Sequence, residues 1–149
     1  MANMVVNIYK NARIKSGLKR EPVAEELCIN VRTLDRYESL SDNTKPDDSL
    51  VANMCKLYGY PYLAWQHIKE GPLGPFFPDI TEEEFSVSTL RMINDFNEVS
   101  KILSEIVNIA SDGKITPDEV EKWEQHRQKL LSLSGSINSL IVQGGVTSA

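Results

Sequence analysis

The sequence contains few of the residues that build disulfide frameworks or metal sites. Its 149 residues include only two cysteines, Cys28 and Cys55, and two histidines, His67 and His126. The cysteines fall on different predicted helices, which predicts free thiols in a reducing compartment. The histidines lie far apart, with no cysteine or paired carboxylates at ligand spacing. We therefore expect no metal site at either histidine.

Long apolar runs are also absent. No stretch approaches the roughly 20 apolar residues that cross a bilayer. The N-terminus has no basic region followed by an apolar stretch, which a secretory signal would have. These absences predict a cytoplasmic protein that does not bind membranes.

The sequence also has no pattern typical of a catalytic site. The segment Gly71-Pro72-Leu73-Gly74 does not suit a phosphate-binding loop, because proline stands inside it. No serine or cysteine lies in a nucleophile motif. Residues 108–119 have the spacing of a calcium-binding loop, but Asn108 and Ala110 leave too few carboxylates to hold the ion. The sequence predicts a non-enzymatic protein without metal or cofactor.

Acidic residues outnumber basic ones, but the two halves of the chain differ. The formal net charge is −5, which argues against an indiscriminate nucleic-acid binder. Residues 1–69 contain 10 Lys and Arg against 8 Asp and Glu, a net charge of +2. Residues 70–149 contain 6 against 13, a net charge of −7. The positive charge therefore lies in the N-terminal half, where a DNA-binding surface would need it.

Residues 20–38 have the pattern of two short helices joined by a tight turn. Apolar residues define one face on each helix: Val23, Ala24 and Leu27 on the first, Leu34 and Tyr37 on the second. Residues 28–30 are typical of a turn, with Asn30 placed to cap the second helix. That helix turns Arg32, Thr33 and Arg36 away from its apolar face. This is the layout of a helix that reads a DNA major groove.

Other positions around this segment extend the pattern. They are Arg13, Gly17-Leu18, Ala24, Ile29, Leu34, Tyr37-Glu38, a proline-containing connector from Ser41 to Pro46, and the helix end Leu57-Tyr58-Gly59-Tyr60. Together they make residues 8–68 resemble the helix-turn-helix domain of the lambda-repressor/Cro-like (Xre) family. The resemblance implies a five-helix, all-α domain that binds double-stranded DNA. It covers less than half of the chain.

Three positions depart from the family pattern. Lys19 stands where a Thr or Ser cap is usual, Arg20 where a Gln commonly touches phosphate, and Cys28 where Gly is usual. Cys28 would have to adopt a left-handed conformation. Arg20 could still bind phosphate. The predicted DNA-binding residues are Lys19, Arg20, Asn30, Arg32, Thr33, Arg36 and Lys45. Asp35 is expected to pair with Arg32 or Arg36, or to accept from a cytosine amino group.

The remaining helices can be placed from caps and apolar spacing. We expect a helix over residues 6–16, a fourth helix capped by Asp47 or Asp48, and a fifth beginning near Pro61. The DNA-binding domain thus spans 1–70, and a Pro/Gly-rich linker spans 71–80. Phe76 and Phe77 in the linker either pack against a flanking domain or anchor a partner subunit.

The capping signals and apolar spacing of residues 81–143 predict a long antiparallel helical hairpin. One helix should start at a Thr81–Glu84 capping box and run to about Ala110. The second should start within residues 116–119. A flexible tail, 144–149, follows.

The apolar stripes of this hairpin are broad enough to need a second copy of the chain as cover. The predicted oligomerisation residues are Phe85, Ile93, Phe96, Leu103, Val120, Trp123, Leu130, Ile137 and Ile141. The alternative is a hairpin that folds back on its own N-terminal domain. We expect a homodimer, or a tetramer or other higher even oligomer.

The sequence as a whole predicts a sequence-specific transcriptional regulator of the phage or bacterial repressor or activator type, open to control by a protein partner. Two alternatives stay open. One is a phage DNA-packaging component resembling a small terminase subunit. The other is a protein-interaction scaffold whose N-terminal domain does not bind DNA.

Overall fold

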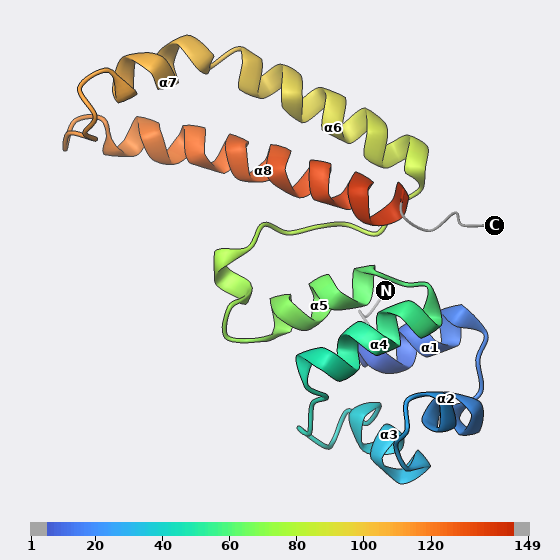
Figure 1. Ribbon diagram of the computed structural model, residues 1–149. Helices are drawn as coiled ribbons and strands as arrows, with labels where there is room; N and C mark the ends of the chain where they lie inside the picture. Colours follow the sequence, from blue (N-terminus) through green and yellow to red (C-terminus); the bar gives the residue numbers. More distant parts are fainter. Residues whose placement is uncertain (1–5, 145–149) are drawn as a thin grey trace. The chain divides into compact units, whose positions relative to one another are not determined.

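The computed structural model describes residues 6–144, and it is all-helical, as the sequence predicts. Its described residues form no strand (Figure 1). The elements are α1 (Ile8–Ser16), α2 (Arg20–Glu26), α3 (Val31–Tyr37), α4 (Asp48–Tyr58), α5 (Tyr62–Glu70), the 3₁₀ helix η1 (Gly74–Phe76), α6 (Phe85–Ser100), α7 (Leu103–Ala110) and α8 (Val120–Gly144). Within residues 6–144, no helix combines the length and apolarity that crossing a bilayer requires. Of the predicted tail, residues 145–149 lie outside the described part.

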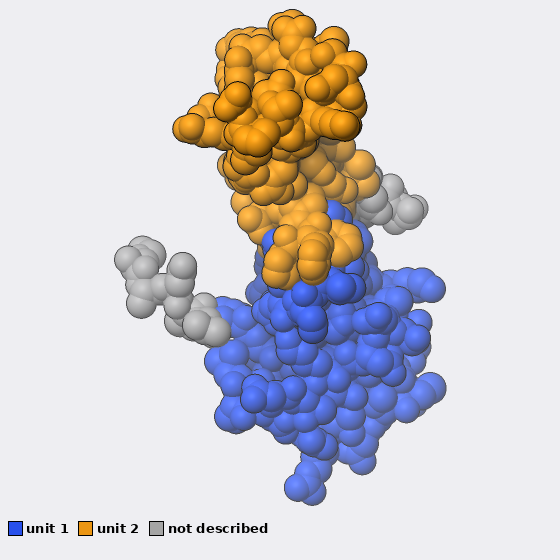
Figure 2. All heavy atoms as spheres, turned by 90° about the vertical axis from the view of Figure 1, so that its left-hand side faces the viewer, with its two compact units in different colours: residues 1–74, 148–149 blue, residues 75–147 orange. Residues whose placement is uncertain are grey.

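The chain divides into two compact units, which Figure 2 colours separately. Unit 1 extends to Gly74 and unit 2 begins at Pro75, so the division falls inside the predicted linker. The predicted packing of Phe76 against a flanking domain is wrong, because its side chain is 81% exposed.

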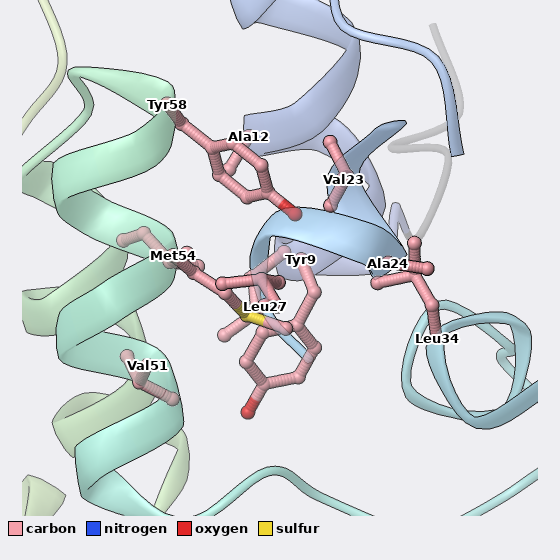
Figure 3. Packing of buried hydrophobic residues seen from close by; sticks show 11 residues of the cluster. Tyr9, Ala12, Val23, Ala24, Leu27, Leu34, Val51, Met54 and Tyr58 are labelled. Atoms are coloured by element: carbon pink, nitrogen blue, oxygen red, sulfur yellow. The ribbon is translucent and has the colours of Figure 1, made fainter. Parts of the chain in front are cut away.

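Unit 1 has a single apolar core to which α1–α5 all contribute. Figure 3 shows its side chains converging, and they include Ile8, Tyr9, Ala12, Val23, Ala24, Leu27, Leu34, Val51, Met54, Tyr58 and Leu63. Leu34, Met54 and Leu63 are completely buried. Burying one such side chain is worth about 1.5–3 kcal/mol relative to leaving it exposed. The core therefore fixes α3 through Leu34, which is the only buried residue within that helix.

The helix ends in unit 1 follow their local capping signals. The Asn7 carboxamide oxygen accepts from the backbone N–H of Tyr9 and of Lys10, each at 3.0 Å. The first helix consequently begins at Ile8, and the prediction that it includes Val6 is wrong. Gly17 ends it at φ 73°, as predicted. Of the two candidate caps for α4, Asp47 is the cap, since its carboxylate accepts from Leu50 N at 2.8 Å.

In unit 2, α6 and α8 run antiparallel beside each other (Figure 1). Small and polar side chains take part in their contact. Ser136 Oγ donates to Asp95 Oδ2 at 2.8 Å, and Ser88 and Ser139 are almost completely buried. A Cβ at Gly135 would lie 2.2 Å from the Asp79 carbonyl oxygen. The two helices and the segment before α6 therefore approach closely because the residues between them are small.

Two predictions about the first helix of this pair are wrong. The helix starts at Phe85, not at Thr81, because Thr81 lies in an extended segment whose N–H donates to Ser139 Oγ at 3.0 Å. The helix is also interrupted at Lys101 and Ile102, which separate α6 from α7. Ile102 is buried at this break, so the chain changes direction where an apolar side chain faces inward.

The start of the second helix also differs from the prediction. Thr116 N–H and Oγ–H both donate to Glu119 Oε2, at 2.9 and 2.8 Å. This is the expected contact between the two residues of a capping box. Regular α-helix nevertheless begins only at Val120, one residue beyond that contact.

Candidate nucleic-acid interface

The segment from α2 to α3 forms a compact pair of helices with a four-residue turn. The inner side of α2 and its end are buried through Val23, Ala24 and Leu27. Asn30 caps α3, and its side-chain oxygen accepts from Arg32 N at 2.8 Å. Cys28 has φ 54°, the left-handed conformation that the sequence predicts for this position. The turn therefore places α3 with its outer side free of the core.

Replacing Cys28 with glycine is expected to stabilise unit 1 by up to about 1 kcal/mol, because glycine adopts positive φ without the penalty that other residues incur. Cys28→Ala is the matched control, since it removes the exposed thiol but keeps the strained backbone. Urea unfolding of both variants and the wild type measures the difference. Equal midpoints for the Gly and Ala variants would show that the turn stores no strain.

The end of α3 is tied to α1 by a buried ion pair. Arg13 Nε lies 2.7 Å from Glu38 Oε1, and Arg13 Nη2 donates to Glu38 Oε2 at 2.8 Å. Arg13 Nη1 also donates to the Leu18 carbonyl at 3.0 Å. The hydrogen bond to Glu38 raises the pKa of Arg13. Sequence reasoning singled out Arg13 and Glu38 separately but missed their pairing, because they are 25 residues apart.

The outer surface of α3 carries two exposed arginines. Arg32 and Arg36 are exposed, whereas Thr33 is half-buried. Asn30 is exposed at the start of the helix, and Lys19 is exposed at the start of α2. Among the described residues, Lys19 and Arg32 form no ion pair, so both are available to bind an anion. These side chains supply the donors that guanine edges and phosphates accept.

The other arginines of the predicted DNA-binding set that form ion pairs are Arg20, with Asp35, and Arg36, with Asp42. Arg20 Nη1 lies 2.8 Å from Asp35 Oδ1, so the expectation that Asp35 pairs with Arg32 or Arg36 is wrong. Arg36 Nε donates to Asp42 Oδ2 at 3.0 Å, and Arg36 Nη2 donates to Thr44 Oγ1 at 2.8 Å. Hydrogen bonds from Thr44 and Arg36 lower the pKa of Asp42 to about 2. A phosphate or base that bound Arg20 or Arg36 would compete with an ionised carboxylate.

Lys45 lies in the loop before α4, and its ammonium points toward the end of α5. Its Nζ is 3.4 Å from the Glu70 carbonyl oxygen and 3.9 Å from Glu70 Oε2. Both side chains are about half exposed, so this ion pair is weak in water. Lys45 is therefore the predicted DNA-binding residue with the least structural support.

The predicted oligomerisation residues of unit 2 lie at its surface. Seven of the nine are exposed, namely Phe85, Ile93, Phe96, Leu103, Val120, Ile137 and Ile141. Trp123 and Leu130 are half-buried. The apolar residues that are buried within unit 2 are others, including Ile80, Val99, Ile102 and Ile109.

Across residues 6–144, no group of three or more His, Cys, Asp or Glu side chains is placed to hold a metal ion. The chemistry available at the α2–α3 surface is thus hydrogen bonding and charge, supplied by arginine, lysine and asparagine. In comparisons with known proteins, no family model, no curated protein and no solved structure matches this chain.

Proposed function

We propose that this protein is a sequence-specific DNA-binding transcriptional regulator, and that α3 is the helix that enters the major groove. The observation that carries the proposal is the contrast between the two sides of α3. Leu34 is completely buried on one side, while Arg32 and Arg36 are exposed on the other. A short helix held by its apolar side, with arginines facing outward, is the layout of a recognition helix.

The resemblance of residues 8–68 to the lambda-repressor/Cro-like (Xre) family supports the same proposal. In this arrangement Arg32 and Arg36 bind base edges, with Asn30 and Thr33 beside them. Lys19 and Arg20, at the start of α2, bind the phosphate backbone. Arginine discriminates guanine because it donates two hydrogen bonds to O6 and N7.

The pairing of Arg36 with Asp42 gives this interface a built-in selectivity. Non-specific DNA offers phosphates but no matching base edges, so it gains little by displacing Asp42. A cognate site offers hydrogen bonds that replace those of the carboxylate. We therefore expect a large ratio of specific to non-specific affinity, in keeping with the net charge of −5.

The regulator would act as a dimer or higher even oligomer on a roughly palindromic operator. Two copies of α3 would then lie about one turn of DNA apart, or a multiple of one turn. Control by concentration or by a protein partner fits this chain best, since neither unit resembles a ligand-sensing domain.

A protein-interaction function is the second candidate, and one observation favours it. Asp35 and Asp42 neutralise two of the predicted DNA-binding arginines, which weakens the positive field around α3. A phage DNA-packaging component, resembling a small terminase subunit, would bind DNA through the same surface. It differs from a regulator in forming rings of eight or more copies.

The test is selection of bound fragments from a random duplex library, followed by titration of the best fragment at several salt concentrations. We expect a palindromic site with a Kd near 10⁻⁸ M. Arg32→Ala and Arg36→Ala should each weaken binding by about 1–3 kcal/mol. Lys10→Ala and Lys56→Ala, each as a single variant, are the charge-matched controls, because both lysines are exposed and lie outside α2 and α3.

One result would contradict the DNA-binding proposal. If no fragment is enriched, and the arginine variants bind DNA as well as the lysine controls do, the α3 surface does not read DNA. The protein-interaction function would then replace the regulator.

A further inference from the structure

Several large apolar side chains of unit 2 are exposed. The contact between α6 and α8 includes small and polar residues such as Ser88, Asp95 and Ser136. Phe96 is 59% exposed and Ile141 is 65% exposed. Unit 2 buries Val99, Ile102 and Ile109, but it leaves larger apolar side chains exposed to water, and covering them would stabilise it.

Phe96 on α6 and Ile137 on α8 lie on the same side of the helix pair. Asp95 and Ser136 face each other across the pair at 2.8 Å. Phe96 and Ile137 each follow one of them, which turns each side chain by about 100° in the same sense. Because α6 and α8 run antiparallel (Figure 1), these two turns bring both side chains to one side.

Three contacts fix how α8 is aligned lengthwise with the segment before α6, with α6 and with α7. Thr81 N donates to Ser139 Oγ at one end, Asp95 meets Ser136 in the middle, and Glu105 Oε2 lies 3.0 Å from His126 Nε2 at the other end. The apolar residues on the shared side therefore form one surface along the whole pair. We call this the apolar face, and it consists of Phe85, Ile93, Phe96, Leu103, Trp123, Leu130, Ile137 and Ile141.

We propose that the apolar face is covered by the same face of a second copy of this chain, related by a two-fold axis. The inference rests on the oligomer that the proposed function requires, and it deepens that function by naming the surface that pairs the two copies. The result is a four-helix arrangement, two helices from each copy, with the apolar residues in the middle.

The area and the composition of the face both suit this occupant. The exposed fractions of its six most exposed side chains correspond to on the order of 700 Å² of apolar surface, near the roughly 800 Å² per partner of a standard interface. The exposed apolar side chains gather on this face although residues 70–149 have a net charge of −7. An interface this apolar is typical of permanent homodimers, whereas transient partners bind more polar surfaces.

The test is the mass of the full chain in solution, measured by sedimentation equilibrium without DNA from about 0.1 to 100 µM. We expect twice the 16.8 kDa of one chain. Phe96→Asp/Ile137→Asp should raise the dimer Kd at least about 100-fold. Val87→Asp is the control, because Val87 is 44% exposed on α6 and lies nine residues from Phe96, which places it on the opposite side of the helix, so it should leave the mass unchanged. Higher salt should not weaken the dimer, because apolar contacts hold it together. Salt also screens the repulsion between the two acidic copies of unit 2.

A second measurement needs no variant, so it still tests the dimer if the aspartate substitutions unfold unit 2. The thermal midpoint of the wild type should rise with protein concentration, as mass action requires of a dimer. A monomer at 100 µM, which would also result if unit 1 covered the face, overturns the inference. A ring of eight or more copies does so too, as does a dimer that Phe96→Asp/Ile137→Asp leaves intact.

The two proposals fail separately. A stable dimer that enriches no DNA sequence retains the interface and removes the regulator. A monomer that still binds a half-site through Arg32 and Arg36 retains DNA recognition and removes the interface.

Discussion

Replacing Glu38 with alanine is expected to cost unit 1 about 3–5 kcal/mol of unfolding free energy, because it leaves a buried arginine without its partner. The side chains of Arg13 and Glu38 are only 11% and 5% exposed. Loss of the carboxylate removes two charge-assisted hydrogen bonds at once, and water has little access to replace them. The total unfolding free energy of a domain of this size is about 5–15 kcal/mol. The variant should therefore be close to unfolding.

The measurement is urea unfolding followed by the fluorescence of Trp65, the tryptophan of unit 1, in a Trp123→Phe background. Asp35→Ala is the matched control, since it breaks an ion pair of similar length between Arg20 and Asp35 whose side chains are 50% and 43% exposed. That loss should stay within about 1 kcal/mol. Similar losses in the two variants would mean that burial does not set the value of the Arg13–Glu38 pair.

Features set by a few neighbouring residues could be predicted from the sequence. The caps at Asn30 and Asp47, and the left-handed residues Gly17 and Cys28, each depend on the local chain. The all-α class followed from apolar spacing in the same way. Such signals extend over three or four residues, so they need no knowledge of the rest of the fold.

Features set by distant contacts could not be predicted. The start of α6 was misplaced because Thr81 donates its N–H to Ser139, 58 residues away, and no local pattern reveals that partner. The small residues that α8 places against its neighbours were not predicted either. Gly135 lies against the Asp79 carbonyl and Ser136 donates to Asp95, and both partners are distant in the sequence.

The candidate DNA surface was predicted in part, for a related reason. The outward position of Arg32 and Arg36 follows from the buried position of Leu34, which is a matter of helical period. The partners of those arginines do not follow from any period. Asp42 reaches Arg36 because the chain after α3 turns back, and Thr44 holds the Asp42 carboxylate in place.

Leu34→Ala is expected to cost about 2–5 kcal/mol, the range for removing a fully buried leucine side chain. Leu34 is the only buried residue within α3, so the cavity opens beneath the proposed recognition helix. Urea unfolding measures the loss. Leu40→Ala is the matched control, because Leu40 is 64% exposed and its truncation should change stability by less than about 0.5 kcal/mol.

The same variant separates positioning of α3 from contact with DNA. Leu34 touches no base in the proposed complex, so its loss should weaken binding only by lowering the fraction of molecules in which α3 is docked. A stabilising osmolyte raises that fraction, and it should restore the affinity of Leu34→Ala but not that of Arg32→Ala. If the osmolyte restored both variants equally, Arg32 would act through stability, and its assignment as a base-reading residue would be wrong.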